Sequence, residues 1–533
     1  MKNRILNSLA VPLLKYRWKK NGLYLFNDKK AQVDFLEKIP SVNLKSKKPS
    51  KILIGSIRSQ NHSLLFEGAL GAAFKKNGFD VKLIQCGQYL NACETKSHFK
   101  DSQIYCSMCH EEFDYYKNAF GLESLKYSEI LPKDLQDNIR SFVNKIELSD
   151  FNEWNGVSLR NEFECGIQRF YLSTQTFFKE KPTVAREFLF TVISSFEVGQ
   201  QLFKQGYTHL ISSHGIYSTW GGLVSGFRNA GGDVTVWGRG YYKSKIVNFK
   251  GESYLNGLKY IDRNYFLNVI NPNNRKEVID YLNARWSLTN TSDLVTYYQK
   301  KDSNLSDKEL ILSDDFQYVS FFPNIPWDGQ AFVSTKNFKS LNDVLDALIK
   351  FTNKNKNVKV IIRPHPAENP KKNPHIGETF LDIAKSYKLE NNQQFIVLPY
   401  SSSLTSYDIA EKVKANILFA GSIGLELAAK GLNVIQMGKN VSSNKEIYFE
   451  PNDYQEFEIM LTKLLNDEGN FNTEIQKKAY EWATFYYSQA HVEDPFFEYK
   501  GYQMVKVKDE IDRWKLAKYM DWVLNGEKLF YEE

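Results

Sequence analysis

The sequence has no long apolar run and no concentrated charge of one sign. No window in its 533 residues approaches the roughly 18 uninterrupted apolar residues of a membrane-spanning helix. The basic start contains the apolar run Leu9–Leu14, but Arg17 and Lys19 follow at once, and the run is too short for a secretory signal. Lys and Arg number 69 against 62 Asp and Glu, so the net charge of +7 is spread over a long chain. We therefore expect a cytoplasmic protein without a nucleic-acid partner.

Cysteine is also scarce, with five residues in the chain. In the reducing cytosol these thiols are not expected to form disulfides. Four of them are clustered in the sequence: Cys86, Cys93, Cys106 and Cys109. Cys106 and Cys109 form a C-x₂-C pair, which is typical of zinc ligands, so the cluster predicts a structural zinc site. An iron–sulfur cluster needs the same ligands, and the simpler interpretation is a core Cys86 with incidental neighbours. Cys165 is expected to be buried and inert.

What the sequence does contain is apolar material, 42% of its residues, which suffices for two hydrophobic cores. The first 50 residues form a basic extension in which Leu6, Leu9, Leu13 and Leu14 recur at helical spacing among Lys and Arg. Such a helix either packs on its own domain or lies on an anionic lipid surface. The second alternative predicts peripheral association with the inner face of the cell membrane.

Strand-like and helix-like segments alternate twice along the chain. In the first half, strands are expected at 51–57, 80–86, 208–213 and 233–237, helices at 62–76 and 221–229, and a mainly helical stretch at 113–205. In the second half, strands are expected at 318–322, 358–362, 395–398, 416–419 and 434–437, and helices at 341–353, 406–414 and 424–429. This alternation predicts two α/β domains, each a Rossmann-like parallel sheet, facing a common cleft.

A polar stretch around 300–315 marks the expected boundary between the two halves. The chain is therefore divided into a basic N-terminal extension (1–50), a first Rossmann-like domain with a cysteine-rich insertion (51–305), a second Rossmann-like domain (306–490) and a C-terminal helical segment (491–533). Ligands of open parallel sheets bind beyond the carboxyl ends of the strands, so the residues that follow each strand are the candidates for chemistry.

The sharpest candidate follows the strand at 358–362. Arg363-Pro-His-Pro366 presents a guanidinium and an imidazole on a loop that two prolines stiffen. This combination suits an anionic group such as a phosphate. The alternative is a proline-stiffened turn whose polar side chains are only solvated.

Three further segments follow strands of the second half. In 420–431, Gly421 and Gly424 allow a ligand to approach the backbone, Ser422 offers a hydroxyl near a helix start, and Glu426 can accept hydrogen bonds from a ribose. Helix–sheet packing and a simple helix-start charge are the alternatives. The serines of Leu398–Ser403 either cap the next helix or bind a phosphate or base. The segment Pro323–Gly329 either lines the cleft or buries its tryptophan.

These motifs carry a resemblance to a known family. Arg363-Pro-His-Pro366, the serine loop before Tyr407-Asp408, and Gly421-Ser-x-Gly-Leu-Glu426 with Lys430-Gly431 resemble the donor domain of bacterial capsule polysaccharide biosynthesis glycosyltransferases. That family has the two-Rossmann GT-B fold and includes β-Kdo transferases with a His-Pro motif. The first half is similar to relatives too, in Ser213-His-Gly215, in Val236–Tyr241, and in Asn324 with Trp327-Asp328 after the boundary.

The resemblance implies sugar transfer from a nucleotide-activated donor, CMP-Kdo-like or NDP-linked, to a capsular or other cell-surface glycan or glycolipid. It implies that His365 contacts the donor phosphate and that Glu426 lies near the ribose. The implied donor-binding set is Arg363, His365, Pro366, Ser401, Ser403, Ser422, Gly424 and Glu426. Arg, His and Ser side chains can stabilise the leaving phosphate, so no metal is expected in catalysis.

A general base for the acceptor hydroxyl must come from the first half. The candidates are His214, Glu67 and, as an anion contact, Arg239. The respective alternatives are a satisfied turn histidine, a surface charge and a structural ion-pair partner. Two other functions remain open at this stage: transfer of a polyol phosphate from a CDP-linked donor, and a non-catalytic nucleotide-binding assembly subunit.

Overall fold

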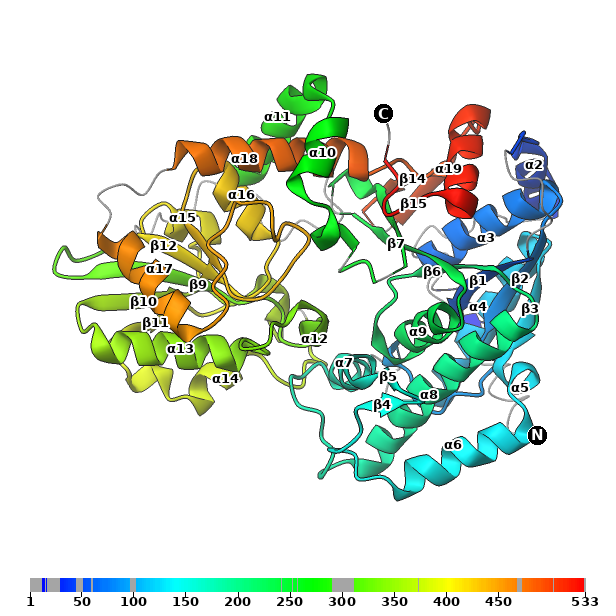
Figure 1. Cartoon of the computed structure of the whole chain (residues 1–533), viewed down its shortest axis with the longest axis horizontal. Helices are drawn as coiled ribbons and strands as arrows, with labels where there is room; N and C mark the ends of the chain where they lie inside the picture. Colours follow the sequence, from blue (N-terminus) through cyan, green and yellow to red (C-terminus); the bar gives the residue numbers. More distant parts are fainter. Residues whose placement is uncertain are drawn as a thin grey trace.

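The computed structural model describes residues 12–14, 16, 29–44, 51–58, 61–95, 102–240, 242–251, 253–255, 257–289, 311–371, 373–466, 472–501 and 503–531. Figure 1 shows two α/β units side by side, the first on the right and the second on the left. The helices α10 (Arg263–Val269), α11 (Arg275–Trp286) and α18 (Thr473–Thr484) lie along the top of this view. The expected domain boundary at 300–315 lies mostly outside the described residues.

The first unit is built on a sheet with the strand order β3-β2-β1-β6-β7-β8. Its strands are β1 Lys51–Ile57, β2 Asp80–Gln85, β3 Glu123–Lys126, β6 His209–Ser213, β7 Asp233–Arg239 and β8 Ile246–Lys250. All neighbours pair in parallel except β8, which is antiparallel to β7. The order of the parallel strands is the doubly wound one, so the Rossmann-like prediction is confirmed for this unit. The short strands β3 and β8 were not predicted.

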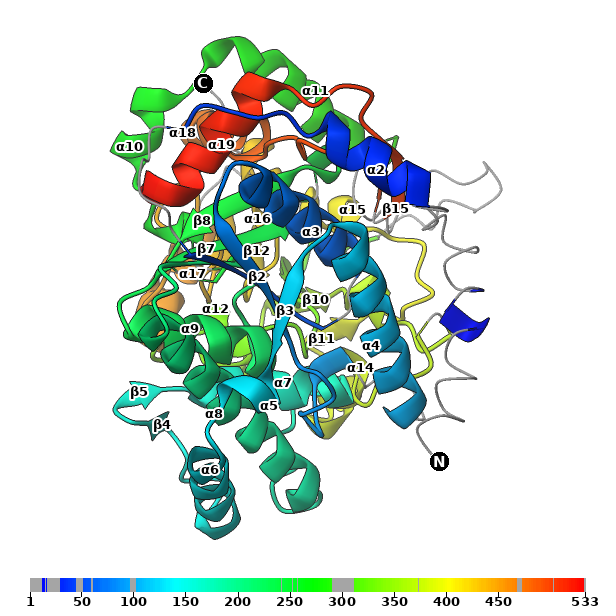
Figure 2. The same cartoon turned by 90° about the vertical axis from the view of Figure 1, so that its right-hand side faces the viewer.

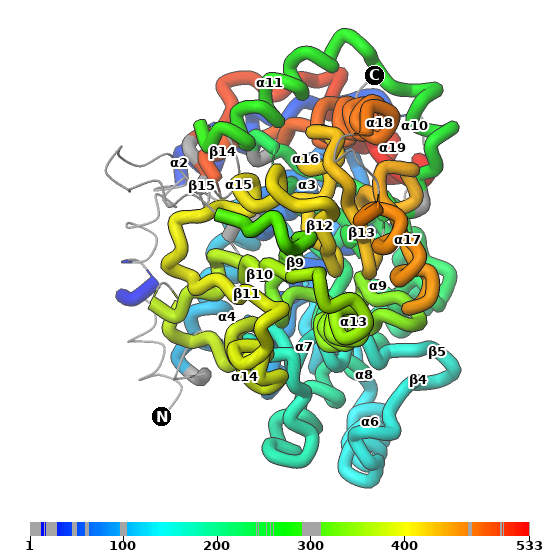
Figure 3. Tube along the Cα trace, turned by 90° about the vertical axis from the view of Figure 1, so that its left-hand side faces the viewer, coloured from blue at the N-terminus to red at the C-terminus, as the bar shows by residue number. Residues whose placement is uncertain are grey.

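The second unit contains a parallel sheet with the strand order β11-β10-β9-β12-β13. Its strands are β9 Gln317–Phe322, β10 Val358–Ile362, β11 Phe395–Val397, β12 Ala415–Leu418 and β13 Val434–Gln436. This is again the doubly wound order, so the two-Rossmann architecture of a GT-B protein is confirmed by the strand order of both sheets. Figure 3, which faces this unit, shows α13 and α14 on one side of the sheet and α15 and α16 on the other.

Helices cover both sheets. In the first unit they are α3 Asn61–Lys76, α4 Ser102–Ala119, α5 Tyr127–Ile130, α6 Lys133–Lys145, α7 Arg160–Tyr171, α8 Pro182–Lys204, the π-helix η2 Tyr217–Gly221 and α9 Gly222–Asn229. In the second they are α12 Gln330–Val333, α13 Leu341–Lys354, α14 Phe380–Ser386, α15 Ser406–Ala410, α16 Ile423–Ala429 and α17 Tyr454–Asn466. A small hairpin, β4 Glu153–Trp154 with β5 Val157–Ser158, precedes α7.

Small residues let α8 and α9 pack closely in the first unit. A Cβ atom added at Gly226 would lie 1.9 Å from the carbonyl oxygen of Phe196, and one at Gly222 would lie 2.6 Å from that of Val192. Side chains larger than hydrogen therefore cannot be placed at these positions without moving the helices apart. The close contact fixes η2, which precedes α9 directly, at the end of β6.

The chain returns to the first unit at its C-terminus. The hairpin β14 (Phe497–Lys500) with β15 (Gln503–Val507) and the helix α19 (Arg513–Asn525) share one core with β1, β2 and α3. Figure 2 shows α19 and α2 (Lys29–Lys38) beside α3. The predicted C-terminal helical segment thus contains a hairpin as well as a helix.

Little of the predicted N-terminal helix lies within the described residues. Residues 12–14 and 16 are helical, and Leu14 is buried against Met108 of α4. Leu6 and Leu9 lie outside the described residues. Among the helices that the structure describes, none combines the length and apolarity needed to cross a bilayer.

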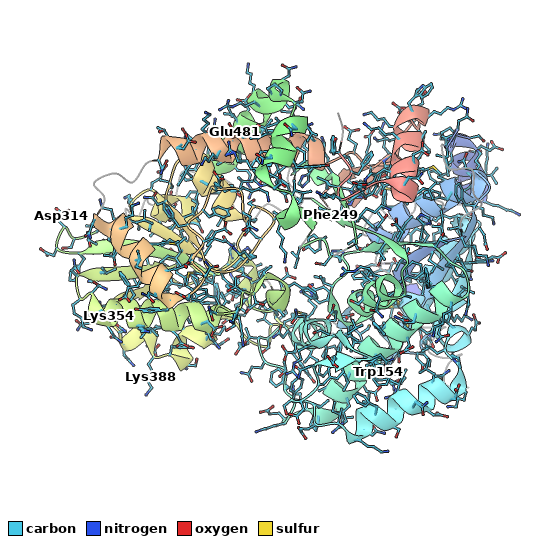
Figure 4. All side chains as sticks on the ribbon, viewed as in Figure 1. Trp154, Phe249, Asp314, Lys354, Lys388 and Glu481 are labelled. Atoms are coloured by element: carbon cyan, nitrogen blue, oxygen red, sulfur yellow. The ribbon has the colours of Figure 1, made fainter. Side chains whose placement is uncertain are left out.

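The two units are held together by helices and by loops at their strand ends. Arg263 of α10 is paired with Glu481 of α18, which Figure 4 labels at the top of the molecule. Lys445 of the second unit donates to the carbonyl oxygen of Leu258, 3.2 Å away, in the first. At the opposite end, α12 packs against α7, and Glu378 accepts a hydrogen bond of 2.8 Å from the backbone of Thr174.

Candidate functional site

The loop that follows β9 brings the strand ends of the two units together. It places Asp328 with an exposed carboxylate, to which the hydroxyl of Tyr217 in the first unit donates a hydrogen bond of 2.7 Å. The next residue, Gly329, has φ +70°, a conformation that favours glycine, and directly precedes α12. Burial lowers the pKa of His214 in the first unit and of His365 in the second, and the charge of Asp328 opposes this lowering in both. The charge of one carboxylate thus acts on an imidazole of each unit.

His365 lies at the carboxyl end of β10 and is mostly buried. Burial lowers its pKa to about 4, the Arg363 charge adds to this effect, and Asp328 opposes it. The ring is therefore neutral at physiological pH. Its Nδ1 accepts a hydrogen bond of 3.2 Å from the backbone N–H of Ala367, at the start of the 3₁₀ turn that Pro366 opens. With Nδ1 as acceptor, the neutral ring carries its proton on Nε2, a hydrogen-bond donor.

Arg363 shapes the site indirectly. Its side chain is buried, and Nε donates to the carbonyl oxygen of Leu404 at 3.0 Å while Nη1 donates to that of Pro399 at 3.4 Å. Arg363 therefore fixes the serine loop that follows β11, and the predicted direct phosphate contact is replaced by a positioning role. Ser401 and Ser403 are exposed on that loop.

The segment after β12 divides into exposed and buried residues. Ser422 is exposed at the start of α16. A Cβ at Gly424 would lie 2.8 Å from Leu418, so this glycine serves helix–sheet packing. Glu426 is buried and accepts a hydrogen bond from Tyr407.

Glu426 is also paired with Arg285 of α11 at 2.9 Å. Two protein groups therefore already engage its carboxylate. This arrangement favours a structural role, which ties α11 to α16, over the predicted ribose contact.

His214 lies at the carboxyl end of β6 in a strained turn. Its φ is +60°, and Gly215 and Tyr217 also have positive φ, immediately before the π-helix η2. Non-glycine residues in this conformation and π-helical turns cluster at functional sites. The ring stacks on Trp220 with centroids 5.1 Å apart, and burial lowers the pKa of His214 to about 4. His214 is therefore a neutral imidazole at physiological pH, and the Asp328 charge acts on it.

Glu67 does not face the space between the units. It is fully buried in α3, where Ser56 Oγ donates to Oε2 at 2.6 Å and Trp237 Nε1 donates to Oε1 at 2.9 Å. Burial raises its pKa to about 7. No substrate can reach this carboxylate, so the hypothesis of Glu67 as base is corrected to a core residue that joins α3 to β1 and β7.

Arg239 is the structural ion-pair partner that the sequence left as an alternative. Its Nη2 lies 3.5 Å from the carboxylate of Asp494, and its guanidinium stacks on Tyr499 at 3.2 Å from the ring centroid. Asp494 is buried and Tyr499 is half-buried, and both belong to the returning C-terminal segment. Arg239 thus anchors that segment on the first sheet instead of holding an anionic substrate.

The four clustered cysteines line one hollow of the first unit. Cys86, Cys93, Cys106 and Cys109 are half-buried around it, whereas Cys165 is fully buried elsewhere, as expected. All five lie in the described part of the chain, and none forms a disulfide. Within the described ranges, no group of three or more His, Cys, Asp or Glu is arranged to hold a metal ion. The zinc site has no support from these positions and stays a prediction.

Two residues at these strand ends were not among the predicted site residues. Asp328 was noted only within the loop after the strand at 318–322, although an exposed acidic residue so placed is a signal for chemistry. Tyr217 carries no such signal, because its hydroxyl meets Asp328 only when the two sheets face each other.

Comparisons with known proteins found similarity to solved structures at low sequence identity. No protein-family model matches the chain, and no curated protein sequence matches it. A KpsC β-Kdo 2,7 transferase structure from Thermosulfurimonas dismutans is 12% identical with a TM-score of 0.33, over 54% of this chain and 85% of that one. A KpsC β-Kdo 2,4 transferase structure from the same organism is 9% identical with a TM-score of 0.31, over 52% and 80%. S. aureus MnaA, solved with UDP, is 10% identical with a TM-score of 0.28, over 89% and 96%. Because these scores are low, the fold assignment rests on the strand order of the two sheets.

Proposed function

We propose that this protein is a glycosyltransferase that moves a sugar from a nucleotide-activated donor to a cell-surface glycan or glycolipid. The observation that carries the proposal is the position of Asp328, whose exposed carboxylate acts on an imidazole of each unit at the facing strand ends. A reaction between two substrates needs such a junction, because one substrate can bind each unit. The motif resemblance supports the capsular or surface-glycan acceptor.

The second unit supplies the donor site in this proposal. As the bond between the anomeric carbon and the phosphate oxygen breaks, the electron pair stays on the phosphate, whose growing charge must be stabilised. His365 donates through Nε2–H to that oxygen. The exposed hydroxyls of Ser401, Ser403 and Ser422 lie on loops that follow neighbouring strands and complete the donor site.

Asp328 acts as the base in this proposal. The acceptor hydroxyl gives its proton to the Asp328 carboxylate while its oxygen forms the new bond to the anomeric carbon. Tyr217 holds the carboxylate in place, and the neutral ring of His214 lines the acceptor side. This chemistry uses only protein side chains, so we expect transfer to continue in the presence of EDTA.

A melting experiment tests the donor site. CMP-, UDP-, GDP- and CDP-linked sugars are added to the protein, and the donor whose nucleotide fits should raise the melting temperature. At a concentration of one hundred times its Kd, this ligand raises the free energy of unfolding by about 2.7 kcal/mol. His365→Gln should weaken this shift at least about tenfold in apparent Kd. His375→Gln, an exposed histidine in the following loop, is the matched control. A full shift in His365→Gln contradicts the donor assignment.

A further inference from the structure

The hollow lined by the cysteines lies at the carboxyl ends of β1 and β2. Its walls come from the end of β1, the loop after β2, helix α4 and the π-helix η2, through Arg58, Cys86, Cys93, Cys106, Cys109 and Thr219. The neighbouring strand pair β1 and β6 is the point at which the strand order of this sheet reverses. Ligands of doubly wound sheets bind at that switch point. The hollow therefore lies next to the position where the first unit should bind a ligand.

Arg58 gives this hollow its chemistry. Its side chain is only 6% exposed, and Nε and Nη1 are buried with no hydrogen-bond partner among the residues that the structure describes. The carboxylate of Glu94 lies 3.8 Å from Nη2, but both of its oxygens already accept hydrogen bonds from Thr219, at 2.9 and 3.0 Å. Buried donors without acceptors are rare and costly in folded proteins. Because the group is a cation, the acceptor that completes it best is an anion.

The backbone on either side of the hollow is held in unusual conformations. Ile57, directly before Arg58, has φ +46°, which is a strained value for a β-branched residue. Gly87 and Gln88, after β2, have φ +63° and +66°. Strain of about 1–3 kcal/mol per residue persists where the surrounding fold enforces it, and such residues cluster at ligand sites. Here the strained residue Ile57 lies at the end of β1, directly before Arg58, which lines the hollow.

The hollow is linked to the proposed transfer site through Trp220. The guanidinium of Arg58 lies 4.0 Å from the centroid of the Trp220 ring, and the ring of His214 stacks on the same tryptophan at 5.1 Å. Arg58 is also close enough for its charge to lower the pKa of His214. An anion bound at Arg58 is thus one aromatic ring away from the imidazole of His214.

We propose that this hollow is an oxyanion subsite of the first unit, in which Arg58 binds a carboxylate or phosphate group of the acceptor sugar. The identification of the occupant as the acceptor rests on the proposed function. The binding of an oxyanion beside the four cysteines does not, and it can be measured without any transfer reaction. The proposal specifies an acidic acceptor, whereas the resemblance specifies the acceptor only as a capsular or other cell-surface glycan or glycolipid.

The cysteines supply the readout, because an occupant of the hollow shields them from alkylation. The wild-type protein is treated with iodoacetamide, and modification of each cysteine is followed by peptide mass spectrometry with D-glucuronate, glucose 6-phosphate or D-glucose present. At ten times its Kd, the acidic sugar leaves the hollow empty in about one protein molecule in eleven. Alkylation of the four cysteines that line the hollow should therefore slow about tenfold. Cys165, which is fully buried outside the hollow, should stay unlabelled in the folded protein, so its labelling would report unfolding.

Each outcome decides a part of the proposal. Protection by glucuronate alone, by the phosphate alone or by both supports the subsite and names its preferred oxyanion. No protection, or equal protection by neutral glucose, overturns it. If no donor raises the melting temperature but the acidic sugar still protects the cysteines, the glycosyltransferase assignment is removed and the oxyanion subsite remains. If a donor raises the melting temperature but no sugar protects the cysteines, the subsite is removed and the glycosyltransferase assignment remains.

Two variants test the role of Arg58. Arg58→Gln should abolish the protection, whereas Arg140→Gln, another arginine stacked on an aromatic ring, should retain it. If melting shows that Arg58→Gln does not fold, Arg58→Lys is the second variant, because it keeps the charge but not the Nε and Nη1 donors. The acidic sugar should protect the cysteines of Arg58→Lys at least about tenfold more weakly than those of the wild type. Protection equal to wild type in a folded variant overturns the assignment of Arg58.

Discussion

Replacing Glu67 by Gln separates a core carboxyl from a catalytic one. Glu67 is fully buried, and burial raises its pKa from 4.5 to about 7, against the opposing hydrogen bonds from Ser56 and Trp237. A raised carboxyl pKa means that the native state binds this proton more tightly than the unfolded state. The resulting stabilisation is present below pH 4.5 and is lost as pH rises through about 7.

The size of the effect follows from the shift. At about 1.36 kcal/mol per pKa unit, the wild type loses about 3 kcal/mol across the whole window, and about 2.5 kcal/mol between pH 5 and pH 8. Glutamine does not titrate, so the variant lacks this loss. A carboxamide also replaces the carboxylate imperfectly as an acceptor for Ser56 and Trp237, which costs about 1 kcal/mol at every pH. Glu162 and Glu368, whose pKa values burial also raises, titrate in both proteins and cancel in the comparison.

Urea unfolding followed by tryptophan fluorescence at pH 5, 6, 7 and 8 measures the difference in stability between the two proteins. We expect the variant to gain about 2.5 kcal/mol relative to wild type from pH 5 to pH 8. Glu390→Gln, at an exposed position, is the matched control and should show no trend. A difference between wild type and Glu67→Gln that is constant over this range would refute the reasoning.

Two other substitutions test the packing and the serine loop. Gly226→Ala should lower the stability of the first unit by about 2–4 kcal/mol, because its Cβ would lie 1.9 Å from the carbonyl oxygen of Phe196. Gly421→Ala should leave thermal unfolding nearly unchanged, because the nearest atom to its Cβ would be 3.7 Å away. Equal melting of the two variants would contradict the close approach of α8 and α9. Arg363→Lys should loosen the serine loop, because one ammonium cannot replace the guanidinium that binds the carbonyls of Leu404 and Pro399. Limited proteolysis should then cut the variant at 399–404 at least about tenfold faster than the wild type. Unchanged proteolysis would show that Arg363 does not hold this loop.

The sequence predicts the two sheets well because their strands are short apolar runs bounded by polar or glycine residues. The strand at 358–362 begins and ends where it was expected, and the other strands of the second sheet differ by one residue at most at each end. The strand β3 was missed because Glu123–Lys126 has a polar sequence and is embedded in a helical stretch. The strand β8 was missed because antiparallel pairing at the sheet edge requires no crossover helix.

The site was only partly predictable because side-chain partners depend on the tertiary fold. The sequence located Arg363 at a strand end, but not the backbone carbonyls that occupy its guanidinium. It placed Glu67 one turn into a helix, but not the burial that removes it from solvent. Asp328 and Arg58 gain their significance from the way the two sheets face each other and from the walls of a hollow, neither of which a local pattern contains.

The most direct test of the account is the hydrolysis of the matching nucleotide sugar by Asp328→Asn in the absence of acceptor, measured with its melting shift. Water then takes the place of the acceptor hydroxyl and needs the same base. The account predicts that nucleotide release falls at least about 100-fold while the donor still raises the melting temperature as in wild type. Asp315→Asn, an exposed aspartate just before β9, should release nucleotide at the wild-type rate. Release at that rate by folded Asp328→Asn would contradict the claim that this carboxylate between the two units is the catalytic base.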